Sequence, residues 1–135
     1  MRKLLWLLLV FLSLVGCAKT DANDIKILPE KSSMIDFYED DGIIHITCMI
    51  TIYNSTNEDV TVRISGYSQE DVNNGLLRSP YLSATNVEEQ SEFFLLKAGQ
   101  YSEYLVDFCG EYAGNLQKKD RLVPDIIELE IVKYR

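Results

Sequence analysis

The chain has 135 residues, 47% of them hydrophobic, and its 13 basic and 21 acidic side chains give a formal net charge of −8. This is the length of one domain. The acidic balance argues against binding to nucleic acid or to anionic lipid head groups through charge, because both would repel the chain. No nucleic-acid partner is expected.

An apolar segment opens the chain. Residues 1–16, MRKLLWLLLVFLSLVG, begin with Arg2 and Lys3 and continue as an apolar run from Leu4 to Leu14. A positive start, an apolar stretch of about 7–15 residues and a small residue at the exit are typical of a secretory signal peptide. A membrane-spanning helix needs about 20 apolar residues, and a core helix would show a polar stripe. We expect residues 1–16 to be a signal peptide.

The four residues Leu14-Val15-Gly16-Cys17 end this run. They resemble the lipobox of bacterial lipoprotein precursors, in which an aliphatic residue, a short residue and Gly or Ala precede the cysteine to be lipidated. The resemblance implies cleavage between Gly16 and Cys17, a diacylglyceryl group on the Cys17 sulfur, and often a further acyl chain, such as palmitate, on the new amino terminus. The alternative is an ordinary secreted protein with a cysteine at this point by chance.

Removal of the leader makes the remaining chain more acidic. The loss of Arg2 and Lys3 takes the basic count from 13 to 11 against 21 acidic residues, a net charge of −10. Because no basic patch can then hold the protein at an anionic surface, attachment has to come from acyl chains, of which two or three hold stably. We expect a lipid-anchored protein on the extracytoplasmic face of the cell membrane, with the bilayer as a partner through Cys17.

Residues 17–32 follow as the lipidated cysteine and a polar tether. The segment IKIL, residues 25–28, is predicted to be a first edge strand, and Pro29 stops it because proline cannot donate a backbone hydrogen bond. One domain, residues 33–135, is expected after the tether.

Apolar side chains alternate with polar ones through this domain. The pattern is clearest in residues 43–53, IIHITCMITIY, and recurs in 60–67, 101–108 and 126–134. Because alternation with a period of two indicates a strand with one buried face, these segments predict antiparallel sheets with one side in water. The side chains expected to face inward are Ile44, Ile46, Cys48, Ile50, Ile52, Val60, Val62, Ile64, Tyr104, Val106, Phe108, Ile127, Leu129 and Ile131.

The turn signals fit this pattern. EDDG at 39–42 predicts a hairpin, because Asp-Gly favours a tight turn, and NSTNED at 54–59 and KAGQ at 97–100 join further strands. Asn54 begins an Asn-Ser-Thr glycosylation sequon, which we interpret as turn chemistry. Two longer connections remain, and the first of them contains GLLRSPYL, residues 75–82, predicted to be a short irregular edge strand.

About seven short strands without a convincing helix predict an all-β, antiparallel β-sandwich, with a small closed barrel as the second choice. The segments ITIYNSTNEDVTV, LLKAGQYSEYLVDF and DRLVPDIIELEIV are similar to the immunoglobulin-like or fibronectin-III-like modules of small bacterial exported proteins. No tryptophan follows Trp6, and Asp107 stands where the antibody-type corner has a tyrosine two residues before the cysteine, here Cys109. The resemblance therefore implies the architecture and not an antibody-type domain.

Few residues of this domain suggest chemistry. Cys48 and Cys109 are either joined by a disulfide between the two sheets or are two separate thiols, one of them buried; Cys109 is out of step with the inward positions. His45, the only histidine, is predicted to face solvent, and no nucleophile is placed beside it by the sequence. Two cysteines and one histidine without close spacing do not predict a metal site. No catalytic residue, metal or cofactor is expected.

The function expected from these features is that of a non-enzymatic, membrane-anchored extracytoplasmic lipoprotein, a protein-interaction or accessory module of the cell envelope. Its partner would be another envelope or extracellular protein. The alternative is a small-ligand or metal-handling lipoprotein that uses loops 68–91 and 110–124 as its site.

Overall fold

The computed structural model describes residues 24–116, 124 and 126–134. Among these residues, no helix has the length and apolar character needed to cross a membrane. Cys17 and the predicted signal peptide lie outside the described residues. The elements are β1 (Ile25–Ile27), η2 (Pro29–Lys31), β2 (Ser33–Asp40), β3 (Ile43–Asn54), β4 (Val60–Tyr67), α2 (Gln69–Asn73), β5 (Tyr81–Asn86), β6 (Phe93–Leu96), β7 (Tyr101–Glu111) and β8 (Ile126–Tyr134).

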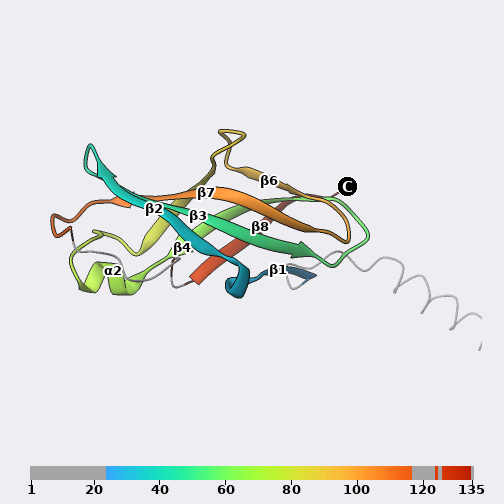
Figure 1. Cartoon of the computed structure of the whole chain (residues 1–135), viewed down its shortest axis with the longest axis horizontal. Coiled ribbons are helices and arrows are strands. Elements are labelled where there is room, and N and C mark those ends of the chain that lie inside the picture. The colour runs from blue at the N-terminus through green and yellow to red at the C-terminus, as the bar shows by residue number, and fades with distance from the viewer. Residues whose placement is uncertain (1–23, 117–123, 125, 135) are drawn as a thin grey trace, which may run out of the picture.

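The described residues form eight antiparallel strands. They are hydrogen-bonded in the order β1-β3-β7-β5-β4-β6, with β2 also beside β3 and β8 also beside β4. In Figure 1, β2, β3 and β7 lie in front, and β4 and β8 run behind them at an angle. The short strand β5 pairs with both β7 and β4 and so joins the two layers. The predicted all-β, antiparallel sandwich is confirmed, with eight strands in place of about seven.

The core lies between these two layers. Alternate residues of β3 point into it, and Ile44, Ile46, Cys48, Ile50 and Ile52 are all 0% exposed, as the period-two pattern predicts. The opposing layer and the neighbouring strands contribute the buried side chains of Val60, Val62, Ile64, Phe94, Leu96, Val106 and Phe108. Ile25 of β1 is also in the core, so the sheet begins before residue 33.

Two of the predicted turns have the expected chemistry. Asp41 and Gly42 have φ angles of 51° and 80° between β2 and β3, the left-handed pair of a tight hairpin turn. Asn54 is buried, and its amide group donates to the carbonyls of Glu58 and Leu96 while its oxygen accepts from the Thr56 N–H. The Asn54 side chain therefore makes hydrogen bonds within the turn, which fits the interpretation of the sequon as turn chemistry.

The connection after β4 differs from the prediction. Residues 69–73 form the one-turn helix α2, and residues 75–82 are not an edge strand. Leu77 is buried and makes an isolated bridge with Tyr112, and β5 starts only at Tyr81, between β7 and β4. Gly110 of β7 lies against this strand, and a Cβ there would lie 2.7 Å from Leu82 Cδ2. The glycine lets the Leu82 side chain approach the β7 backbone.

Candidate functional site

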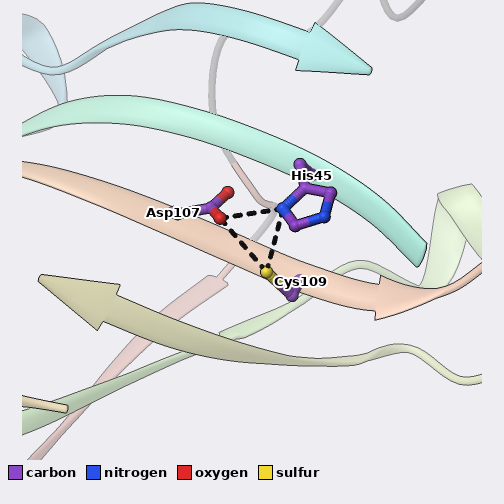
Figure 2. A group of neighbouring side chains, drawn as sticks. All are labelled: His45, Asp107 and Cys109. Atoms are coloured by element: carbon purple, nitrogen blue, oxygen red, sulfur yellow. Dashed lines mark hydrogen bonds and ion pairs between the residues drawn. The ribbon is translucent and has the colours of Figure 1, made fainter. Parts of the chain in front are cut away.

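A cluster of three chemically active side chains lies on the outer face of the front layer. Register sets His45 of β3 directly opposite Cys109 of β7, and Asp107 is two residues earlier on the same strand. Because side chains on a strand alternate between faces, Asp107 and Cys109 share the face turned away from the core, and His45 joins them from the neighbouring strand. Figure 2 shows the three side chains converging between the two strands. We call them the outer-face triad.

The three donor atoms form a small triangle. His45 Nδ1 lies 2.8 Å from Asp107 Oδ2, a distance at which an imidazole N–H donates to a carboxylate. Cys109 Sγ is 3.3 Å from the same nitrogen and 3.3 Å from the same oxygen, to which its thiol donates. The His45 and Asp107 side chains are 20% and 19% exposed. Solvent therefore reaches a site that is largely enclosed.

Neighbouring side chains hold the triad in place. The Tyr38 ring of β2 stacks on His45, with centroids 4.7 Å apart and planes 7° from parallel. The Thr47 hydroxyl lies 3.5 Å from the second carboxylate oxygen of Asp107. Because β3 and β7 pair continuously from Ile43 to Tyr53, the backbone under the triad is a rigid ladder.

The protonation of Cys109 opposes nucleophilic catalysis. Burial, together with the negative charge of Asp107 and the hydrogen bond to it, raises the pKa of the Cys109 thiol to about 12. A reactive cysteine needs the opposite surroundings, which stabilise its thiolate. In a catalytic triad, moreover, the nucleophile and the carboxylate contact different nitrogens of the imidazole, whereas Cys109 and Asp107 both contact Nδ1.

The predicted site residues have different outcomes. No disulfide joins Cys48 to Cys109. They cannot meet, because Cys48 pairs with Val106 on the core side while Cys109 pairs with His45 on the outer side. The interpretation as two separate thiols, one buried, therefore holds. His45 faces outward as predicted, but the sequence did not reveal its neighbours, which are 62 and 64 residues away. The sequence did give one indication, because Cys109 falls out of step with the inward-facing positions of its strand, and this phase favours an outward-facing side chain.

A groove over β6 is a second surface feature. It has a volume of about 680 Å³ and runs along the outward side chains of the strand. Phe93 and Leu95 form its apolar floor and are 40% and 45% exposed. The remaining lining residues are polar or amphipathic: Asp59, Thr61, Asn86, Glu89, Ser91, Lys97, Ser102 and Tyr104.

Side chains protect the edge of β6 that faces away from β4. The Asn86 amide donates to the Phe93 carbonyl at 3.3 Å, and the Tyr104 hydroxyl donates to the Leu95 carbonyl. An open strand edge is a template for pairing with another chain. Because these carbonyls already have donors, the groove offers side chains rather than backbone to a partner.

The groove shares only part of its lining with the two loops expected to form a ligand site. Of the 68–91 loop, Asn86, Glu89 and Ser91 line the groove, and the described part of the 110–124 loop contributes no lining residue. The outer-face triad comes from strands. Comparison of the chain with protein-family models, with curated proteins and with solved structures finds no match.

Proposed function

We propose that this chain is a membrane-anchored extracytoplasmic lipoprotein whose β-sandwich is a non-enzymatic protein-interaction module of the cell envelope. The partner it fits is an extended protein segment with apolar side chains that lie on Phe93 and Leu95. The observation that carries the interaction is the groove over β6.

The anchor is supported by the leader sequence. Leu14-Val15-Gly16-Cys17 follows a positive and apolar start, and the residues after it turn polar. Acyl chains on Cys17 would hold a domain that carries too much negative charge to adhere to an anionic bilayer by itself.

The composition of the groove supports a protein partner. Interfaces bury an apolar centre inside a polar rim, and Phe93 and Leu95 are surrounded here by the charged side chains of Asp59, Glu89 and Lys97. Asp59 and Lys97 already pair at 3.2 Å at one end, which leaves Glu89 as the acid available to a basic residue of the partner. Side-chain pockets along a strand suit an extended peptide.

The anchor is tested by replacing the lipidated cysteine. Cys17→Ala removes the sulfur that accepts the lipid. We therefore expect the full chain to lose its added acyl mass and to be lost from the membrane fraction that detergent extracts. Intact mass spectrometry and fractionation measure both effects, and Cys48→Ala serves as the matched control that keeps the lipid. A Cys17→Ala chain that still runs at lipidated mass would refute the anchor.

The interaction is tested by site-specific photo-crosslinking in the cells that produce the protein. A crosslinking side chain at position 95, in the groove, is expected to trap a discrete adduct, and Phe93→Asp in the same chain is expected to abolish it. A crosslinker at position 103, exposed on the outer face of β7, is the control. Equal adducts from both positions, or an adduct that survives Phe93→Asp, would contradict the proposed groove.

A further inference from the structure

We propose that His45, Asp107 and Cys109 bind a divalent transition-metal ion, with Zn²⁺ as the best match, on the outer face of the sandwich. This site is separate from the groove over β6 and does not depend on the proposed function. Its three residues lie on the paired strands β3 and β7, with their possible ligand atoms within 4.8 Å of one another.

The donor atoms select the class of metal. An imidazole nitrogen, a carboxylate oxygen and a thiolate sulfur are the three ligand types that Zn²⁺ uses in proteins. Calcium and magnesium prefer oxygen alone, and a sulfur ligand excludes them here. One thiolate and one carboxylate also balance the two positive charges of the ion.

The triangle has nearly the dimensions of a tetrahedral face. With metal–ligand distances of about 2.0–2.3 Å, the ligands of a tetrahedral zinc ion are about 3.3–3.6 Å apart. The two distances from Cys109 Sγ are 3.3 Å, and the distance from His45 Nδ1 to Asp107 Oδ2 is 2.8 Å. Opening the His45–Asp107 contact by about half an ångström would give the face of a zinc site.

Proton counting shows why an ion suits this place. Both Asp107 Oδ2 and Cys109 Sγ lie against His45 Nδ1, which carries at most one proton, and the Cys109 proton also points at Asp107 Oδ2. Three atoms able to donate an electron pair thus share at most two protons. A bound cation would contact all three at once: the thiol proton would leave to solvent, and the neutral imidazole would carry its proton on Nε2.

The surroundings orient the ligands as metal sites require. Stacking on Tyr38 fixes the plane of the His45 ring, and the Thr47 hydroxyl lies by the Asp107 oxygen that faces away from the triangle. Such contacts to ligands affect metal affinity by about 10–100-fold. Three protein ligands leave a fourth position for water or for a ligand from another molecule. The site therefore resembles an exchangeable metal site more than a closed structural one.

Cobalt(II) is the probe that tests this proposal. The full chain, purified in mild detergent under reducing conditions and freed of metal, is titrated with Co²⁺. We expect one ion per chain, a thiolate-to-cobalt charge-transfer band and the intense visible bands of four-coordinate cobalt, all removed by added Zn²⁺. Absence of a charge-transfer band, or a band that Zn²⁺ does not displace, would overturn the proposal.

Variants assign the ligands. Cys109→Ser is expected to abolish the charge-transfer band, and His45→Gln and Asp107→Asn should each weaken Co²⁺ binding by more than the roughly 10–100-fold that an outer contact is worth. Glu103→Gln, a carboxylate change on the same face of β7, should leave the titration unchanged, as should Cys48→Ala and Cys17→Ala. Circular dichroism checks the fold of each variant. A band that follows Cys48 or Cys17 in place of Cys109 would also overturn the proposal.

Discussion

Asp107 contacts the His45 and Cys109 side chains through one carboxylate oxygen. His45 Nδ1 is 2.8 Å and Cys109 Sγ 3.3 Å from the same oxygen. Partial burial favours the protonated thiol over the thiolate, and the negative charge of Asp107 at this distance acts in the same direction. In the metal-free protein, Cys109 is therefore a protected thiol and not a reactive one.

Removing this charge is predicted to make Cys109 more reactive. The raised pKa, about 12, means little thiolate near neutral pH, and Asp107→Asn removes the charge and so lowers the pKa of Cys109. Each unit of decrease raises the thiolate fraction about tenfold. Alkylation of metal-free protein by iodoacetamide, followed by mass spectrometry of the Cys109 peptide, measures the rate. In the unsubstituted chain the rate should still increase above pH 9.

The control for this prediction is Glu103→Gln, which removes a charge from the same face of β7 without contacting Cys109. Its alkylation rate should equal that of the unsubstituted chain. Cys48 is an internal control, since it is buried at 0% exposure and should react only on unfolding. A midpoint near the ordinary cysteine pKa in the unsubstituted chain would contradict the protected thiol.

Among the elements, strands were predictable where one face is buried and the other is wet. Alternation located β3, β4, β7 and β8, and Asp-Gly located the hairpin between β2 and β3. Alternation did not locate β5, which is a strand only through its pairing with the distant strands β4 and β7. The one-turn helix α2 is too short for a helical period to be visible in the sequence.

The turn after β3 supports a stability prediction at this scale. Asn54→Ala would leave the buried carbonyl of Leu96 without its amide donor and the Thr56 N–H without its acceptor. Leaving buried polar groups unsatisfied costs about 1–3 kcal/mol, so we expect the free energy of unfolding to fall by that amount. Denaturant unfolding measures it. Asn57→Ala, at an exposed position of the same turn, should change little, and an equal loss in both variants would refute this role of Asn54.

At the scale of the whole molecule, the site was hidden by distance along the chain. In the sequence, His45 and Asp107 could be recognised as polar positions of their strands, and Cys109 as a cysteine out of step with the inward-facing residues. Which of them meet depends on the register between β3 and β7, and no short stretch of sequence states that register. The groove over β6 depends likewise on β4, β7 and the 86–91 loop coming together. Fold class follows from local alternation, whereas both candidate sites follow from long-range pairing.

The pairing of β3 with β7, which brings the triad together, also affects how the chain folds. β3 pairs with β7, and β4 with β8, so the central contacts join segments such as those of His45 and Asp107, which are 62 residues apart. Contact order this high is typical of domains that fold in milliseconds to seconds. Both layers stay incomplete until β7 and β8 are available to pair with β3 and β4. A chain that has to pass through a membrane unfolded would thus stay unfolded until its final strands had emerged.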